Sequence, residues 1–493
     1  MKKQSFVHGA AVLAAASILC KIMSAALKIP LDRFFLHEEG IAVYQSAYSI
    51  YNVFLAICVT GIPIALSSLV AGSDRREAAT LCKSTFVVIT VFSGLGGVLL
   101  FLFANPLARL LSGGGRPVAA LSLMILSAAL PFMGFISSRR GYFQGIGNMT
   151  PSALSQLAES LAKVALGIGI CALLVGKGIS YGAAGAICGV TIGAFAAATV
   201  LEIYFHREKC EKGSFSMQKA LLVVKTSIPM TLGAFGFTAV LLTDTLTVPK
   251  LLAATGVETL ERLKMFGYLT RANTVYNLPA TIITAFTASA VPAIAAARAE
   301  HNEKSLRENT LKAITLIFLA AMPCTLGMVL FSREILTLLY SSGVYSILLA
   351  MTGVMVLIMP YIQTSTAMLQ TLGKVWKPIL VSGGAVILKA VLNFVLIPAL
   401  GVVGATVATV AAFLPALVIN TVMLSKSVSL KGAGIVLCKI VFCSVVACTA
   451  AKLLYVLTGG TLALLGSLGA AVIIYGILVV LLRCITAEDL RGK

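Results

Sequence analysis

Positively charged residues within apolar stretches are the feature of this sequence best suited to chemistry. In the first apolar run, Ser17, Lys21, Ser24 and Lys28 are spaced four, three and four residues apart. This spacing places them on one face of a helix. A stripe of cations facing a cavity suits an anionic substrate, because a charge inside a membrane needs a cavity or a partner. The alternative, a side chain that reaches the membrane surface, is credible for Lys28 near the end of the run and poor for Lys21.

A second candidate is Arg271, which lies in a polar segment together with Asn277. Arginine stays charged and can bind a phosphate through two N–H groups, so it would suit a diphosphate beside the lysine stripe. The other interpretation is an arginine at a helix end, since this helix begins near residue 264. Asn52 matches Asn277 in an internal repeat, and both are predicted to contribute to substrate binding.

Three further sites carry charge within apolar runs. Glu159 and Lys163 are four residues apart, a spacing that favours a structural ion pair on one helix. Lys389 and Asn393 have the same spacing, but no acidic residue is adjacent to them in the sequence. Asp244 could be a coupling-ion ligand, a partner for a cation or an exposed residue at a helix end, and the sequence leaves these three open.

The elements that position these residues follow from composition. The 493 residues are 59% hydrophobic and 11% charged, with a mean hydropathy of +0.99, which excludes a water-soluble domain. The apolar runs have the length of about 20 residues that one membrane-spanning helix needs, and they lack the alternation of barrel strands. The sequence therefore predicts an all-α polytopic membrane protein with about fourteen spans. The expected spans are 6–31, 41–71, 79–106, 117–137, 151–175, 180–206, 219–246, 264–296, 311–332, 346–371, 377–398, 401–425, 432–457 and 461–483.

Lysine and arginine are concentrated in alternate loops, for example at Arg75, Arg139, Arg140 and Arg207. This asymmetry predicts that both termini lie in the cytoplasm and that the number of spans is even. The first run is too long for a signal peptide and is predicted to be an uncleaved span. The net charge of +20 is then a topology signal and a fit to anionic lipid, and no nucleic-acid partner is expected.

The sequence offers no motif for catalysis or for metal binding. Its eleven cysteines fall mostly within the expected spans and form no CxxC pair, which favours structural thiols over a metal site. GxxxxGK[ST] and HExxH are also absent from the sequence. We therefore expect no metal, no cofactor and no enzyme activity.

An internal repeat indicates the organisation of the chain. Gln144, Gly147 and Lys163 match Gln370, Gly373 and Lys389 at one offset of 226 residues, and Gly182–Gly185 resembles Gly401–Gly404. Chance similarity among small residues is the alternative. The repeat predicts two six-helix lobes, 1–210 and 211–428, followed by two helices and a tail in 429–493. Such parallel halves are a transporter architecture with the site between them.

These features together resemble the polysaccharide-flippase branch of the MOP superfamily. The resemblance rests on the fourteen spans, on Tyr51-Asn52 to Ile62-Pro63, on Gln144-Gly-Ile-Gly-Asn and on Gly401-Val-Val-Gly404-Ala. Within this branch, the chain is similar to the stage V sporulation protein B group, whose members are related to MurJ. The resemblance implies a V-shaped pair of lobes that exports an undecaprenyl-diphosphate-linked glycan by alternating access. It also implies that the last two helices form a groove for the lipid tail.

The resemblance also assigns roles to residues. Basic residues on helices 1 and 8 of MurJ-like proteins meet the diphosphate, and Lys21, Lys28 and Arg271 occupy comparable helices here. Helix 1 has lysines where MurJ has arginines, which leaves open whether the glycan is lipid II or a related unit. Some relatives bind sodium through carboxylates on helices 7 and 11. Asp244 matches the first of these, but Lys389 and Asn393 stand on the second, so Na⁺, H⁺ and the membrane potential all remain candidate energy sources.

The predicted function is thus export of a lipid-linked glycan across the bacterial inner membrane, for cell-wall or spore-cortex synthesis. The expected partners are this substrate, the phospholipid bilayer and cell-wall synthesis proteins. The main alternative is a cation-coupled drug or metabolite antiporter of the MATE type, which would need a cavity carboxylate. Two others are a membrane glycan transferase, for which Asp74, Glu77, Glu258 and Glu261 form no convincing pair, and a noncatalytic scaffold.

Overall fold

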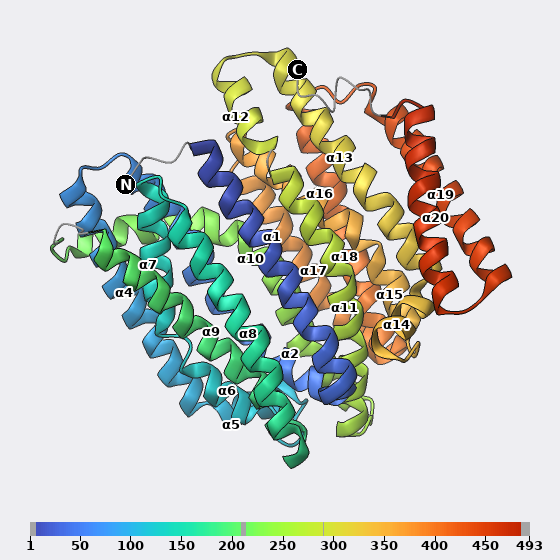
Figure 1. Cartoon of the computed structure of the whole chain (residues 1–493), viewed down its shortest axis with the longest axis horizontal. Helices are drawn as coiled ribbons and strands as arrows, with labels where there is room; N and C mark the ends of the chain where they lie inside the picture. The colour runs from blue at the N-terminus through green and yellow to red at the C-terminus, as the bar shows by residue number, and fades with distance from the viewer. Residues whose placement is uncertain (1–5, 209–212, 289, 485–493) are drawn as a thin grey trace. The chain divides into compact units, whose positions relative to one another are not determined.

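The computed structural model of the chain describes residues 6–208, 213–288 and 290–484, and over these ranges the chain is helical without any strand (Figure 1). Its first elements are α1 (Phe6–Pro30), η1 (Leu31–Leu36), α2 (His37–Phe54), η2 (Leu55–Gly61), α3 (Ile62–Ala71), α4 (Arg75–Leu102), α5 (Ala104–Leu111), α6 (Ala120–Ser127), α7 (Phe132–Gly145), α8 (Thr150–Leu174), η3 (Val175–Lys177), α9 (Ile179–Arg207) and α10 (Met217–Ala254). They are followed by α11 (Thr259–Ala288), α12 (Ala290–Ala299), α13 (Glu303–Leu330), α14 (Ser332–Tyr340), α15 (Ser346–Gly353), α16 (Met355–Thr371), α17 (Trp376–Leu400), α18 (Val402–Ser425), α19 (Ala433–Thr458) and α20 (Thr461–Leu481).

Ten helical segments of the described chain are long and apolar enough to cross a membrane, or up to twelve if each of two bent pairs forms one span. The prediction of an all-α polytopic membrane protein is confirmed, whereas the count of fourteen spans is not. One of the ten segments, Ala15–Ala71, has 57 residues. At 1.5 Å per residue it is far longer than the roughly 30 Å of a bilayer core. It includes the break at His37, where φ is +51°, and it covers parts of two predicted spans.

Packing groups the helices into two units. The first runs to Thr270 and includes Asn393–Val402, while the second contains Arg271–Leu392 and the chain from Val403 onward. In the first unit α10 packs against α2, η2, α3 and α4. These units describe packing, whereas the lobes 1–210 and 211–428 rest on internal similarity, so the lobe boundaries remain a prediction.

Glycines allow α8 and α9 of the first unit to approach closely. A Cβ on Gly189 would lie 2.5 Å from the Cα of Gly167, and one on Gly193 would lie 2.7 Å from the carbonyl oxygen of Glu159. With Gly185, these residues recur every fourth position, which is the small-residue pattern of closely packed membrane helices. The contact fixes the face of α8 that carries Glu159 and Lys163.

A π-helical segment, η2, joins α2 to α3 and connects them to α7. The wider π turn disturbs the normal backbone ladder, and the carbonyl oxygen of Cys58 accepts a hydrogen bond from the hydroxyl of Ser137 on α7. At Gly61 the backbone lies directly against Thr231 of α10, where any side chain would clash. The segment therefore ties α2, which carries part of the site described below, to two neighbouring helices.

The internal repeat reappears in the helices. α4 and α13 each have 28 residues, α6 and α15 have 8, and α8 and α17 have 25. The C-terminal turns of α7 and α16 also match: each ends in a glycine with positive φ, +79° at Gly147 and +82° at Gly373. The other matched glycines differ in their position relative to the helix: Gly401 precedes α18, whereas Gly182 already lies inside α9.

In the second unit, α19 and α20 pack together, and α19 also packs against α13. One apolar cluster joins Ile440, Cys443 and Val479 to Phe318 of α13. Near the other end of α19, Lys452 forms a 2.7 Å ion pair with Glu334 of α14. The last two helices are thus fixed to this unit by apolar packing and by a charge pair.

Candidate functional site

Two lysines converge on one tyrosine in the first unit. Lys28 of α1 lies 5.7 Å from the ring centroid of Tyr48 of α2, and Lys163 of α8 lies 4.4 Å from the same centroid. The Lys163 ammonium also donates a 2.8 Å hydrogen bond to the Tyr48 hydroxyl, and Lys28 donates one of 2.8 Å to Oε1 of Gln45. We call Lys28, Gln45, Tyr48 and Lys163 the lysine–tyrosine cluster.

Neighbouring residues hold the acceptors of this cluster in place. Nε2 of Gln45 donates to the Ser49 hydroxyl at 3.0 Å, and Thr245 of α10 donates to the same hydroxyl at 2.9 Å. The Tyr48 ring lies between those of Tyr44 and Tyr51, with centroid distances of 5.5 and 5.9 Å. The cluster is therefore preorganised by α2 and α10, although its cations come from α1 and α8.

The acidic residue expected to neutralise Lys163 is bound elsewhere. Glu159 accepts a 2.9 Å hydrogen bond from Arg140 of α7, which also donates to Ser155. The Glu159–Lys163 ion pair expected from the spacing does not form, because the more rigid guanidinium of Arg140 reaches both Ser155 and Glu159 of α8. No carboxylate within the described ranges forms an ion pair with Lys28 or Lys163. The cluster thus presents two cations with neutral hydrogen-bond acceptors.

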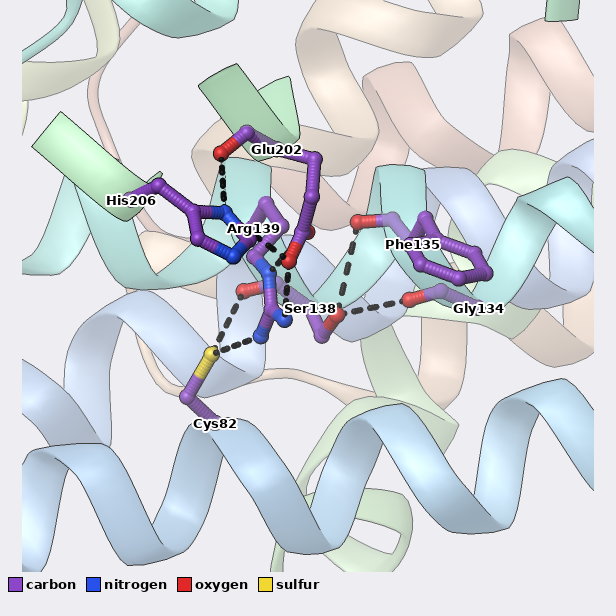
Figure 2. A network of polar contacts seen from close by, with 7 residues as sticks. All are labelled: Cys82, Gly134, Phe135, Ser138, Arg139, Glu202 and His206. Carbon is purple, nitrogen blue, oxygen red and sulfur yellow. Dashed lines mark hydrogen bonds and ion pairs between the residues drawn. The ribbon is translucent and has the colours of Figure 1, made fainter. Parts of the chain in front are cut away.

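Arg139 forms a second charge pair on α7, drawn in Figure 2. Its Nε donates to Glu202 of α9 at 2.9 Å, a second nitrogen donates to the other carboxylate oxygen at 3.3 Å, and a third lies 3.3 Å from the Cys82 thiol. Its guanidinium carbon lies 3.6 Å from the Phe205 ring centroid. The sequence placed Arg139 and Arg140 among loop cations, but both are buried within α7. They therefore do not belong in the loop count.

The polar stripe of α1 is divided among different environments. Ser17 donates a 2.8 Å hydrogen bond to Gln156 of α8, Lys21 is exposed, and Ser24 is half-buried. Only Lys28 enters the lysine–tyrosine cluster. A single helical face therefore meets both a packed neighbour and open space, because α1 covers only part of α8.

The candidates on α11 lie in other surroundings. Arg271 is buried, with its guanidinium carbon 5.0 Å from the ring centroid of Tyr340 in the second unit. Asn277 is half-buried farther along α11, and Asn52 is half-buried on α2 of the first unit. Arg271 therefore lies within the helix packing, not exposed at a helix end.

Asp244 and Asn393 are brought together within the first unit. Nδ2 of Asn393 donates to Oδ1 of Asp244 at 3.3 Å and to the Thr247 hydroxyl at 2.8 Å. The other amide atom, Oδ1 of Asn393, is buried without a hydrogen-bond donor among the described residues. Lys389, one helical turn earlier on α17, is fully buried. Within the described ranges, no three His, Cys, Asp or Glu residues are grouped as they would be to hold a metal ion.

Some of these residues carry a local signal that sequence reasoning did not use. Gln45, Ser49 and Asn52 are spaced four and three residues apart on α2, as are the polar residues of α1. Tyr48 belongs to the same polar region, and this face could have been identified beside the lysines. No local pattern links Arg139 to Glu202, because 63 residues separate them.

The model of the polysaccharide biosynthesis protein family matches residues 6–298 of the chain. The chain belongs to this family. The family region spans α1 to most of α12 and therefore contains the lysine–tyrosine cluster and both arginine pairs of α7.

Two relatives of this family member come from Bacillus subtilis (strain 168). Stage V sporulation protein B is 26% identical over 511 residues, an alignment that covers all of this chain and 98% of the relative. Lipid II flippase MurJ is 24% identical over 452 residues, and this alignment covers 85% of this chain and 82% of the relative.

Solved structures share the fold of this chain. Lipid II flippase MurJ in an inward closed conformation has a TM-score of 0.74 at 14% identity, with 96% of this chain and 98% of that chain covered. An inward-facing MATE family multidrug resistance transporter of the MOP superfamily has a TM-score of 0.65 at 16% identity, covering 83% and 96%. At these identities the likeness concerns the fold, and the side chains must distinguish the functions.

Proposed function

We propose that this protein moves an undecaprenyl-diphosphate-linked glycan across the membrane by alternating access, for cell-wall or spore-cortex synthesis. The observation that carries the proposal is the lysine–tyrosine cluster, in which Lys28 and Lys163 converge on Tyr48 without a paired carboxylate. Two ammonium groups within an apolar bundle favour an anionic ligand, because a charge there needs a partner. A diphosphate supplies that charge, and the relation to a lipid II flippase supports this substrate class.

Each side chain has a role in this proposal. Lys28 and Lys163 bind diphosphate oxygens, while Gln45 and Tyr48 hold the ammonium groups before the substrate arrives. Lys21 and Ser24 extend the cationic face of α1 toward the substrate. Asn52 and Asn277 are proposed to donate hydrogen bonds to the substrate, and Arg271 is proposed as an anion-binding group of the second unit. No bond is broken in this cycle, so the protein acts as a transporter and not as an enzyme.

The test is movement of a fluorescent undecaprenyl-diphosphate sugar between leaflets of proteoliposomes. We expect Lys28→Gln and Lys163→Gln to slow this movement strongly, and Arg271→Gln to do so in a separate experiment. Lys177→Gln is the matched control, because Lys177 is exposed in η3, away from the cluster. Unchanged movement in folded Lys28→Gln and Lys163→Gln proteins would contradict the cationic site.

A drug or metabolite antiporter of the MATE type is the alternative, and it shares the fold. Export of an organic cation calls for a free carboxylate, but Glu159 and Glu202 are each bound by an arginine of α7, and Asp244 accepts a hydrogen bond from Asn393. This favours the flippase. Uptake of organic cations by the proteoliposomes, with no movement of any lipid-linked sugar, would reverse this preference.

We further propose that Asp244 and Asn393 form the ion-coupling element of the cycle. The unused oxygen of Asn393 beside the Asp244 carboxylate would suit Na⁺, whereas a proton could bind the carboxylate directly. The neighbouring Lys389 could supply the positive charge in place of an ion. Sugar movement measured with Na⁺ or choline gradients, and at different membrane potentials, separates these cases.

The topology and the partners remain proposals of the same kind. The loop charges other than those of Arg139 and Arg140 still favour cytoplasmic termini, but residues 1–5 and 485–493 lie outside the described residues. We propose a bacterial inner-membrane location and association with cell-wall synthesis proteins. Accessibility of single cysteines introduced at the two termini of a cysteine-free variant would test the orientation.

A further inference from the structure

A groove of about 660 Å³ runs between α7 and α9 of the first unit. Its walls are aromatic and aliphatic: Phe132 and Phe135 come from α7, and Phe195 and Ile203 from α9. Phe195 is 55% exposed and Ile203 is 47% exposed. Exposed apolar side chains along a membrane-spanning helix face hydrocarbon, so this groove opens toward lipid.

One end of the groove is polar and carries a net positive charge. His206 and Arg207, both exposed, lie there in the last turn of α9. Glu202 also lines the groove, but its carboxylate is bound through both oxygens by Arg139 (Figure 2). Nδ1 of His206 donates to the Glu202 carbonyl oxygen at 2.9 Å and lies 3.5 Å from Oε1 of the Glu202 carboxylate, so the outer ring nitrogen is directed away from both contacts. The charge that remains available at this end is therefore cationic.

The spacing of these residues corresponds to one leaflet of a bilayer. From Phe195 to Arg207 the helix advances twelve residues, or about 18 Å at 1.5 Å per residue. Half of a typical hydrocarbon core is about 15 Å, and the headgroup begins beyond it. An acyl chain along Phe195 and Ile203 would thus place a phosphate beside His206 and Arg207.

We propose that this groove is a binding site for one anionic phospholipid. The acyl chain packs against the aromatic wall, and Arg207 and His206 contact the phosphate. The site belongs to α7 and α9 alone, and the proposal rests on the membrane-spanning fold and not on the transported substrate. Because α7 also carries Arg139 and Arg140, a bound lipid would brace the helix whose two arginines hold α8 and α9.

The test uses tryptophan fluorescence quenched by brominated lipids. The chain contains a single tryptophan, Trp376, so Trp376→Phe with Phe195→Trp places one reporter in the groove. We expect brominated phosphatidylglycerol to compete for this reporter about fivefold better than brominated phosphatidylcholine, the preference that one basic residue gives near an anionic lipid. Arg207→Ala should reduce this preference toward one, and Arg207→Lys should retain most of it.

Two matched controls accompany the reporter. Phe442→Trp on α19 is 57% exposed in the native protein and, in the same Trp376→Phe background, should show no preference between the two lipids. Arg109→Ala removes an exposed arginine of α5 and should leave the preference at Phe195→Trp unchanged. Native mass spectrometry of the unmodified protein and of Arg207→Ala, each with added phosphatidylglycerol, gives a second measurement that needs no reporter.

Several outcomes would overturn the proposal. Equal quenching by both lipids at Phe195→Trp would mean a nonselective surface, and no quenching by either would mean that protein covers the groove. Displacement of phosphatidylglycerol by equimolar undecaprenyl phosphate would assign the groove to the transported lipid. A different result separates this proposal from the proposed function: a native protein that moves no lipid-linked sugar but keeps its phosphatidylglycerol preference would contradict the flippase and leave the lipid site unaffected.

Discussion

In the two repeats, matching helices are joined by different kinds of side-chain contact. In the first, Arg139 of α7 is joined to Glu202 of α9 by an ion pair. The residue 226 positions later, Ser365 of α16, accepts a 3.2 Å hydrogen bond from Asn420 of α18. Arg140 likewise corresponds to Thr366, which also accepts from Asn420 at 3.2 Å. The link between matching helices is therefore charged in one repeat and neutral in the other.

A buried lysine occupies the same position in both repeats. Glu159 of α8 corresponds to Ala385 of α17, but Lys163 corresponds to Lys389, and both lysines are buried. The arginine and glutamate charges of the first repeat cancel one another in pairs. Lys163 does not belong to those pairs, which indicates that its role differs from that of the arginine–glutamate pairs.

The largest effect should come from breaking the charged link. Glu202→Gln leaves the Arg139 guanidinium, only 9% exposed, without its carboxylate, and should lower the free energy of unfolding by about 3 kcal/mol. Titration with sodium dodecyl sulfate in mixed micelles would measure it. Arg139→Met combined with Glu202→Gln should recover most of the loss, since no buried charge remains. The control is Glu308→Gln, at an exposed glutamate of α13. An equal decrease in unfolding free energy for this control would contradict a special role of the Arg139–Glu202 pair.

The neutral link of the second repeat should be weaker. Asn420→Ala removes two hydrogen bonds to Ser365 and Thr366 and should cost about 2 kcal/mol in the same titration. Thr421→Val, which removes the neighbouring 2.8 Å contact with Tyr361, should cost about half as much. If Asn420→Ala proved more costly than Glu202→Gln, the charged link would not be the stronger of the two.

The shared lysine should affect transport more than stability. Lys163→Met removes a charge-assisted contact with the substrate and should slow sugar movement at least tenfold, or about 1.4 kcal/mol. Its unfolding free energy should fall little, because a buried ammonium group is itself costly. Tyr48→Phe keeps the ring and removes only the hydroxyl acceptor, so we expect a smaller, few-fold decrease. A Lys163→Met protein with normal transport and reduced stability would make the lysine a packing residue.

The smallest loss of stability should come from the positive-φ glycines that follow α7 and α16 in the two repeats. Gly147→Ala and Gly373→Ala each force an L side chain into a left-handed conformation and should cost about 1 kcal/mol. Gly373→Ala should cost slightly more, since its Cβ would lie 3.1 Å from a guanidinium nitrogen of Arg298. Gly169→Ala, within α8 and with open space around its Cβ, is the control and should be neutral or stabilising. Thermal unfolding curves of the three variants and the native protein, measured in parallel, would show this order of stability changes.

The sequence by itself predicted the membrane-spanning helical class and the cationic face of α1, and it matched Gly147 to Gly373. Each is encoded locally: hydropathy marks an apolar helix, a spacing of three or four marks one face, and glycine permits positive φ. These properties do not depend on which helices become neighbours. For this reason Lys28 and Arg271 could be selected as substrate-binding candidates, and Lys163 as a structural charge, before any contact was known.

The tertiary structure decided which partner each charge has. Lys163 meets Tyr48 across 115 residues, Arg139 meets Glu202 across 63, and Asn393 meets Asp244 across 149. The expected Glu159–Lys163 pair was the nearest in sequence, yet packing of α7 beside α8 gives Glu159 to Arg140. Charge partners depend on which helix faces pack together, and here that depends on close backbone approaches at Gly167, Gly189 and Gly193. A local pattern identifies a charge, but only the packed helices determine what neutralises it.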